Sequence, residues 1–161
     1  MSEVALQLAR LGDAPAIANM SRTLVEAGLP WSWTPRRVAD LMRRRESLAV
    51  IAKVHGDLVG FVLAQFGDRA VHVALLAVAE GRRREGIARR LLGWVEESAV
   101  VAGLFQVNLE VRAINRSARC FYTALGYVEC GRMNGYYSGV EDAIRMSRDL
   151  LVRRPGASLP R

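Results

Sequence analysis

The feature that most constrains this chain is an arginine-rich stretch that joins two segments of different periodicity. An apolar run, Val73–Val78, leads into it, and an amphipathic pattern that includes Ile87 and Leu91 leaves it. The sequence therefore predicts a strand, a tight turn containing Gly86, and the start of a helix. Amide N–H groups at a helix start are free and lie at the positive end of the helix dipole, so such a turn can bind phosphate. A solvated basic loop before a surface helix is the alternative interpretation.

Size and composition favour a single globular domain. The chain has 161 residues, of which 51% are hydrophobic and 24% are charged, and this is enough to bury one core. No apolar run reaches membrane-spanning length and Met1-Ser2-Glu3 does not open a secretory signal, so we expect a cytoplasmic protein with no membrane partner. Cys120 and Cys130 are too few for a disulfide framework or a cysteine zinc site. We expect the domain to occupy residues 1–151 and a flexible tail to occupy residues 152–161.

The net charge of +7 comes from 23 Lys and Arg against 16 Asp and Glu, and Lys53 is the only lysine. Arginine matches phosphate geometry well, so a phosphorylated ligand, a nucleic acid or an acidic protein are possible partners. A GC-rich genome would produce the same arginine bias without any partner. Only the cluster from Arg82 to Arg90 calls for a local explanation.

The pattern of elements predicts an α+β domain. We expect one mixed, mostly antiparallel sheet of six or seven strands, flanked by about four helices. It would contain a meander, a strand–helix–strand crossover and a final hairpin whose long loop carries Tyr136 and Tyr137. The strands are expected at about residues 4–11, 48–54, 58–66, 70–78, 104–111, 127–132 and 142–150, and the helices at about 13–25, 35–45, 87–101 and 115–125.

Glu110 and Tyr122 are the residues that could perform chemistry. Glu110 is near the end of a strand on its polar face, and Tyr122 is in the helix that follows, so both should lie near the sheet edge where ligands bind. A carboxylate there could accept a proton from an amine, and a phenol could protonate a leaving group. A solvated carboxylate and a half-buried packing residue are the alternatives. His72 has no ligand partner at metal spacing, so we expect a structural or surface residue and no metal site.

Three other residues invite interpretation. Trp31 and Trp33 in the loop between the first two helices are either core residues or the lining of a substrate mouth. Cys120 has no activating histidine nearby in sequence, so we expect a small packing residue.

Two segments together resemble the GNAT superfamily of N-acetyltransferases. Residues 83–88, Arg-Arg-Glu-Gly-Ile-Ala, fit its Q/R-x-x-G-x-G/A pattern. The later segment Leu109-Glu110-Val111-Arg112, followed by Asn115, Ala118, Phe121-Tyr122 and Leu125-Gly126-Tyr127, is similar to its second motif. The ending Tyr136-Tyr137, Glu141-Asp142-Ala143 and Met146, together with Pro30-Trp31-Ser32, resembles the ribosomal-protein-alanine (RimI-type) branch. The resemblance covers residues 4–150.

The resemblance implies acetyl-CoA as the acetyl donor. It implies Glu110 as general base and Tyr122 as general acid, and it implies a protein N-terminus as the acceptor, bound between the Trp31/Trp33 and Tyr136/Tyr137 loops. The donor would be held by a strand segment, a phosphate-binding turn and the start of a later helix: Leu76, Ala77, Val78, Arg83, Arg84, Glu85, Gly86, Ile87, Ala88, Arg89, Asn115 and Ala118.

The chain departs from the family pattern after the strand. Ala79-Glu80-Gly81 replaces the usual acidic–proline pair, and Arg82 replaces a common aromatic, so Arg82 is expected either to meet the 3′-phosphate of coenzyme A or to be solvated. Two other functions stay open from the sequence. The acceptor could be a small-molecule amine, or the chain could be a non-catalytic CoA- or RNA-binding module, although it has no recognisable RNA-binding motif. Whether the protein is a monomer or a dimer also stays open.

Overall fold

The computed structural model describes residues 3–152. They form seven strands in one mixed sheet and four α-helices, as the sequence predicts. The strands are β1 (Ala5–Leu8), β2 (Ser47–Val54), β3 (Asp57–Phe66), β4 (Val71–Val78), β5 (Gln106–Arg112), β6 (Val128–Tyr137) and β7 (Glu141–Asp149). The helices are α1 (Ala14–Leu24), α2 (Pro35–Met42), α3 (Ile87–Val101) and α4 (Arg116–Ala124). Of the expected tail, all but residue 152 lies outside the described residues.

The sheet order is β1-β2-β3-β4-β5-β7-β6, and every pairing is antiparallel except that of β4 with β5. This parallel pair needs a crossover connection, which α3 supplies. The β2–β3 turn is a two-residue hairpin at His55 and Gly56, both of which have positive φ. No helix within residues 3–152 is long and apolar enough to cross a membrane.

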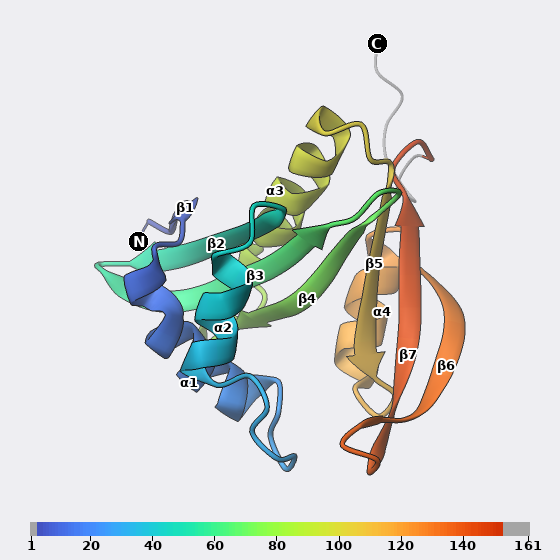
Figure 1. Ribbon diagram of the computed structural model, residues 1–161, viewed down its shortest axis with the longest axis horizontal. Helices are drawn as coiled ribbons and strands as arrows, with labels where there is room; N and C mark the ends of the chain where they lie inside the picture. The colour runs from blue at the N-terminus through green and yellow to red at the C-terminus, as the bar shows by residue number, and fades with distance from the viewer. Residues whose placement is uncertain (1–2, 153–161) are drawn as a thin grey trace.

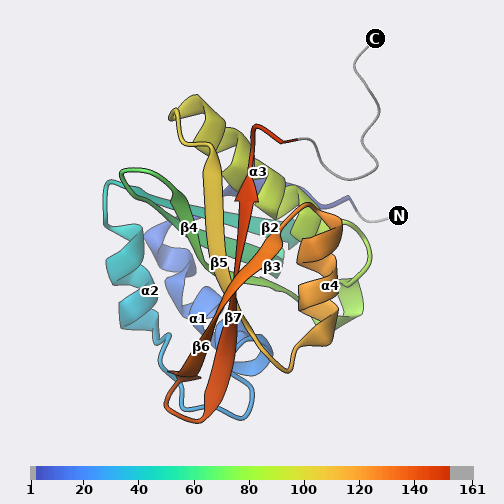
Figure 2. The same cartoon turned by 90° about the vertical axis from the view of Figure 1, so that its right-hand side faces the viewer.

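Helices cover both faces of the sheet. In Figure 1, α1 and α2 lie in front of β2, β3 and β4, and α3 lies behind them. Figure 2 shows α3 and α4 together on the side of the sheet opposite to α1 and α2. The core is accordingly in two parts: α3 and α4 pack on one set of alternating strand residues, and α1 and α2 pack on the other.

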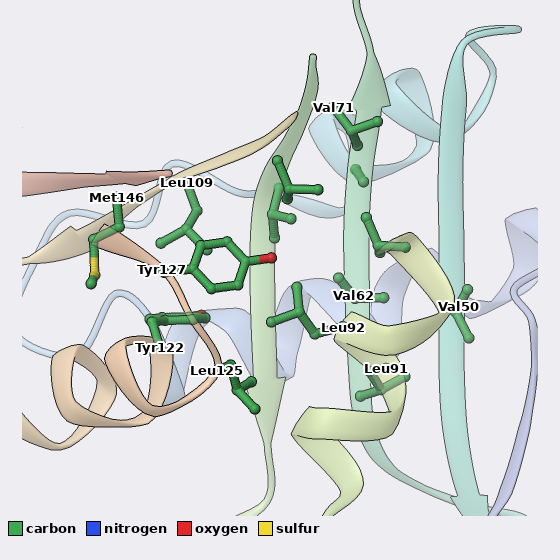
Figure 3. Packing of buried hydrophobic residues seen from close by; sticks show 14 of the residues in the cluster. Val50, Val62, Val71, Leu91, Leu92, Leu109, Tyr122, Leu125, Tyr127 and Met146 are labelled. Carbon is green, nitrogen blue, oxygen red and sulfur yellow. The ribbon is translucent and has the colours of Figure 1, made fainter. Parts of the chain in front are cut away.

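The larger core part joins α4 to the second half of the sheet. Figure 3 shows Tyr122 of α4 beside Tyr127, with Leu109 and Met146 of the sheet close to them. The two tyrosine rings meet edge to face with centroids 5.7 Å apart. This packing fixes α4 against β5, and it therefore fixes the position of Tyr122 relative to the end of β5.

A β-bulge in β4 changes which face its side chains occupy. Leu63 of β3 pairs with Leu75, but the next residue, Ala64, pairs with Val73, so Ala74 is the extra residue. Val73 belongs to the core part under α3 and α4, whereas Leu75 belongs to the part under α1 and α2. The alternation of side chains between the two faces of the strand therefore breaks at Ala74.

Strands β4 and β5 pair over only three residues each. The register runs from Val71 opposite Val107 to Val73 opposite Leu109, and beyond this point the strands diverge, as Figure 1 shows. From Ala74 onward, the edge of β4 that faces β5 has no strand partner in the described sheet. The gap between the two strands is the place where the fold opens a site.

The final hairpin differs from the expectation in one respect. Tyr136 and Tyr137 are not in a long loop, because β6 continues to Tyr137, which pairs with Glu141 of β7. The connection is the short turn Ser138-Gly139-Val140, in which Ser138 and Gly139 have positive φ. The two tyrosines are thus held by strand pairing, with their rings edge to face and centroids 4.9 Å apart.

Candidate active site

A cavity of about 730 Å³ occupies the gap between β4 and β5. The α1–α2 loop and the end of the β6–β7 hairpin form its outer walls. Of the residues singled out in the sequence, its lining includes Glu110, Tyr122, Trp33, Tyr136, Tyr137, Leu76, Asn115 and Ala118. The two candidate catalytic residues and both aromatic segments therefore meet in one cavity.

Glu110 is a shielded carboxylate rather than a solvated one. Strand β5 alternates, so Leu109 and Val111 enter the core and Glu110 faces the cavity. Its side chain is only 8% exposed. One carboxylate oxygen lies 2.5 Å from His72 Nε2, and the other accepts a hydrogen bond of 3.3 Å from Arg145 Nη2.

His72, which the sequence predicts to be a structural or surface residue, is 41% exposed and contacts Glu110. The parallel register sets His72 beside Asn108, two residues before Glu110 on the same face of β5, and the imidazole reaches the Glu110 carboxylate. Burial raises the pKa of Glu110, but the contacts with His72 and Arg145 outweigh it, so the pKa lies below its usual value. Glu110 is consequently ionised at neutral pH.

Tyr122 is buried at 8% exposure and lines the cavity from the opposite side, on α4. Burial raises the pKa of its phenol well above the usual value, because the low-dielectric surroundings disfavour a phenolate. The hydroxyl therefore keeps its proton throughout the physiological range. A carboxylate that is ionised and a phenol that is protonated thus face one cavity.

The two tryptophans do not play the same part. Trp33 lines the cavity, and the guanidinium of Arg37 lies 3.8 Å from the centroid of its ring. Trp31 is not in the cavity lining; its ring packs on the α1–α2 core part and carries Arg22 at 4.8 Å. Trp31 therefore packs against the core, and Trp33 forms part of the cavity wall.

Arg112, which sequence reasoning did not single out as a functional residue, joins the two outer walls of the cavity. Its Nε donates to Glu141 at 2.7 Å and its Nη2 pairs with the same carboxylate, which anchors the β6–β7 hairpin. Its Nη1 donates to the carbonyls of Val25 and Ala27, at 3.3 and 2.8 Å, which anchors the α1–α2 loop. One side chain at the end of β5 therefore sets the distance between both walls.

Glu26 orders the rest of the α1–α2 loop. This buried carboxylate accepts hydrogen bonds from the Ser32 amide at 2.9 Å, the Ser32 hydroxyl at 2.7 Å and the Trp33 amide at 2.8 Å. These three hydrogen bonds to one carboxylate therefore hold Trp33 in its position at the cavity wall.

The arginine-rich turn has the backbone geometry of an anion site. Arg84 and Gly86 both have positive φ, +67° and +78°, and Gly86 is the N-cap of α3. The helix ladder begins with the Arg90 amide, which donates to the Gly86 carbonyl at 3.0 Å, so the amides of residues 86–89 precede the ladder. A Cβ built on Gly86 meets no protein atom within 4 Å, so the turn is open on that side.

The other residues expected at the donor site occupy two positions. Leu76 lines the cavity, whereas Ala77 and Val78 are farther along β4 and belong to the core packing on opposite faces. Arg82 Nη1 lies 3.6 Å from Glu85 Oε1 within the turn. Residues 83–89 are not in the cavity lining: residues 83–86 form the turn, and residues 87–89 begin α3.

Asn115 and Ala118 begin α4 at the rim of the cavity. The Asn115 side chain accepts a hydrogen bond of 3.1 Å from the Ala118 amide and thereby caps α4. Its amide NH₂ group is not used in this bond. Within residues 3–152, no group of three or more His, Cys, Asp or Glu side chains is arranged to hold a metal ion.

The family model that describes the acetyltransferase (GNAT) family matches residues 18–127, more than half of the chain. The chain belongs to this family. An N-alpha-acetyltransferase 20 from Dictyostelium discoideum is 35% identical over 109 residues, which are 64% of this chain and 62% of that protein. The chain spans about three fifths of the length of several curated relatives that it matches.

Two solved structures extend the likeness of this GNAT chain over nearly its whole length. The Ard1 protein of Thermoplasma volcanium is similar with a TM-score of 0.82 and 25% identity, covering 92% of this chain and 99% of that one. The ribosomal-protein-S18-alanine N-acetyltransferase of Escherichia coli is similar with a TM-score of 0.80 and 24% identity, covering 98% and 100%. The second likeness shows a shared fold.

Replacing Gly86 by alanine tests the turn as a phosphate site. We expect Gly86→Ala to weaken CoA binding at least roughly 10-fold, because a left-handed residue with a Cβ costs about 1–2 kcal/mol and the turn must shift its amides to relieve it. Isothermal titration with CoA measures the loss. Gly56→Ala is the matched control, since Gly56 also has positive φ and open space around its Cβ but lies in the β2–β3 hairpin. Equal CoA affinity of the two variants would contradict the assignment.

Proposed function

We propose that this protein transfers the acetyl group of acetyl-CoA to the N-terminal α-amino group of a protein. The observation that carries the proposal is the cavity between β4 and β5, which Glu110 lines from the sheet and Tyr122 from α4. The proposal makes Glu110 the general base and Tyr122 the general acid.

The residues around the gap fit coenzyme A. Its pyrophosphate is a dianion that suits the amides of residues 86–89, which precede the hydrogen-bond ladder of α3. Its pantetheine arm carries amides that can bond the unpaired edge of β4 from Ala74 onward, as an added strand would. Asn115 and Ala118 at the start of α4 would border the arm. When bound, acetyl-CoA supplies an acetyl group that is activated as a thioester.

Two side chains of this chain then transfer protons, one as a base and one as an acid. Glu110 is ionised and faces the cavity, so it accepts a proton from the acceptor amine, and His72, 2.5 Å away, is placed to share that proton. As the new C–N bond forms and the C–S bond breaks, the Tyr122 hydroxyl protonates the departing sulfur. No covalent enzyme intermediate is needed, and holding amine and thioester together contributes up to about 7–11 kcal/mol.

The side chains that line the cavity walls suit an acceptor that is an extended peptide. Trp33 on one side and Tyr136 and Tyr137 on the other line it, and Arg112 links the two segments that carry them. Relatives named as N-alpha-acetyltransferases support the same class of acceptor. The motifs resemble a branch that acts on ribosomal-protein alanine, so a peptide that begins with alanine is the first acceptor to try.

A panel of acceptors tests the proposal. The purified protein with acetyl-CoA is offered an Ala-initial peptide, the same peptide with a blocked N-terminus and an internal lysine, a polyamine and an aminoglycoside, and release of CoA thiol is followed. We expect the first peptide to be turned over with the highest kcat/KM. Turnover of a small amine alone would make the protein a small-molecule acetyltransferase.

The pH dependence of kcat/KM should follow the ionisation of the acceptor amine. Because the pKa of Glu110 is lowered and that of Tyr122 is raised, neither changes its charge between about pH 6 and pH 9. The acceptor α-amine has a pKa of about 7.7–8.0 and must lose a proton, so we expect kcat/KM to rise with pH and level off near that value. A peptide whose α-amine has a lower pKa should shift the rise downward by the same amount. A rise that stays fixed for both peptides would instead report an enzyme group.

A further inference from the structure

The side chain of Tyr122 is held in place by packing of its ring. Within residues 3–152 its hydroxyl forms no hydrogen bond with the protein, and the side chain lines the cavity. The ring meets those of Phe121 and Tyr127 edge to face, with centroids 5.2 and 5.7 Å apart. An acid that gives its proton to a ligand needs such an open hydroxyl. The position of the phenol is therefore set by the rings that surround it.

Tyr127 is fixed at both its backbone and its hydroxyl. Its amide donates to the carbonyl of Tyr122 at 3.0 Å, at the end of α4. Its ring is fully buried, and its hydroxyl donates to Oε2 of Glu96 at 3.1 Å. Figure 3 shows the ring beside Tyr122, with the hydroxyl directed away from α4. Burial and the Glu96 carboxylate both raise the pKa of the Tyr127 phenol, so the hydroxyl keeps its proton and remains a donor.

Glu96 connects this hydrogen bond to the helix of the candidate phosphate site. It is a residue of α3, whose first turn carries the amides of residues 86–89. Arg148 of β7 donates to the same carboxylate oxygen as Tyr127, and both charged side chains are buried. Hydrogen bonds to charged groups are strong, and a satisfied buried network is rigid. A continuous set of buried contacts thus runs from Tyr122 through Tyr127 and Glu96 to α3.

We propose that Tyr127 is a positioning residue, which through Glu96 fixes the Tyr122 phenol relative to the first turn of α3. This inference rests on the proposed function and adds the residues that position its acid. With the pyrophosphate of acetyl-CoA at α3, the place of the sulfur is set by the length of the pantetheine arm. The phenol must lie at that place, and a displacement of about 1 Å can reduce a rate by roughly 10²-fold. The buried network keeps the phosphate site and the phenol at one separation.

The Tyr127→Phe variant removes the hydrogen bond to Glu96 and keeps the ring. We expect kcat with acetyl-CoA and an Ala-initial peptide to fall by roughly 10-fold, while the KM for acetyl-CoA stays within about twofold of the wild-type value. Ile51→Val is the matched control, because Ile51 is also fully buried but lies in β2, and loss of one methylene group there lowers stability without contact with α4. Its kcat should match that of the wild type. An equal fall in both variants would overturn the proposal.

A double-mutant cycle tests whether Tyr127 acts through the acid. In a Tyr122→Phe background there is no phenol to position, so the addition of Tyr127→Phe should change kcat by less than about twofold. Two independent losses would multiply instead. A multiplied loss would overturn the positioning role, because Tyr127 would then affect turnover by another route.

A shortened donor tests the connection to α3. Acetyl-pantetheine has the thioester but no pyrophosphate, so its sulfur is not tied to the phosphate site and can follow a displaced phenol. We expect Tyr127→Phe to reduce kcat/KM by roughly 10-fold for acetyl-CoA and by less than about twofold for acetyl-pantetheine. A simple loss of folded protein would reduce both equally, and an equal reduction would overturn the connection.

The outcomes distinguish this inference from the proposed function. If the wild-type protein acetylates no α-amine, or if Tyr122→Phe alone leaves kcat unchanged, the proposed function or its acid fails. If both hold and Tyr127→Phe has the kcat of the wild type, only the positioning role is overturned. Should circular dichroism show that Tyr127→Phe does not fold, the triple variant with Glu96→Leu and Arg148→Met replaces it, because it leaves no polar group of this network unpaired. It must show the same dependence on the donor.

Discussion

The Glu110→Gln variant should lose most of its turnover while it still binds acetyl-CoA. The amide keeps the size of the side chain but cannot accept the proton of the amine, and positioned general bases contribute roughly 10²–10⁴-fold to a rate. Because Glu110 lies on the acceptor side of the gap, the loss should appear in kcat with little change in the affinity for acetyl-CoA. Steady-state kinetics with an Ala-initial peptide and isothermal titration with acetyl-CoA measure the two quantities.

Glu129→Gln is the control for this result. Glu129 also pairs with an arginine, Arg119 at 2.8 Å, but it lies on the exposed strand β6 outside the cavity. Its replacement should leave kcat within about twofold of the wild-type value, as is usual for an exposed ion pair that touches no substrate. Unchanged kcat in both variants would remove Glu110 from its role as base, and a matching fall in both would indicate a general loss of structure.

A buried ion pair between Glu96 and Arg148 should contribute strongly to the stability of the fold. Arg148 of β7 donates to the carboxylate of Glu96 on α3, and Tyr127 donates to the same oxygen at 3.1 Å. All three side chains are buried. We expect Arg148→Met to lower the free energy of unfolding by about 3–5 kcal/mol, because it removes the arginine of a buried ion pair. Urea unfolding followed by circular dichroism measures the loss.

Two further variants test whether the loss comes from breaking a buried ion pair. Arg132→Met breaks the exposed pair with Asp142 and should cost no more than about 1 kcal/mol. The double variant Glu96→Leu, Arg148→Met removes both charges and should recover most of the stability, since a buried ion pair often contributes little over apolar residues of similar volume. A double variant that is less stable than either single one would contradict this explanation.

Local signals in the sequence predicted much of the fold. Helix α3 begins at Ile87 and ends at Val101, as expected, because Gly86 and Gly103 adopt positive φ at its two ends. The crossover from β4 through α3 to β5 was predicted because the spacing of apolar residues changes from that of a strand to that of a helix and back. The expected hairpin loop with Tyr136 and Tyr137 was wrong, because the glycine-rich end of β6 obscures a strand that pairing with β7 extends.

The site was only partly predictable for a related reason. Glu110 and Tyr122 follow from strand alternation and helix position, but the partners of Glu110 depend on register between distant segments. His72 is 38 residues away in sequence and meets Glu110 through the parallel pairing of β4 and β5. The extra residue Ala74, which shifts β4 from one face to the other, has no local signature in an apolar run.

In the proposed reaction, the gap between β4 and β5 brings an acetyl group to an α-amine at Glu110. Its most direct test is fragmentation mass spectrometry of a peptide that carries both a free Ala N-terminus and an internal lysine, after incubation with the purified protein and acetyl-CoA. We predict one added acetyl group on the α-amine, formed by the wild-type protein and not by Glu110→Gln in the same time. An acetyl group on the lysine alone, or equal acetylation of the α-amine by both proteins, would contradict the claim.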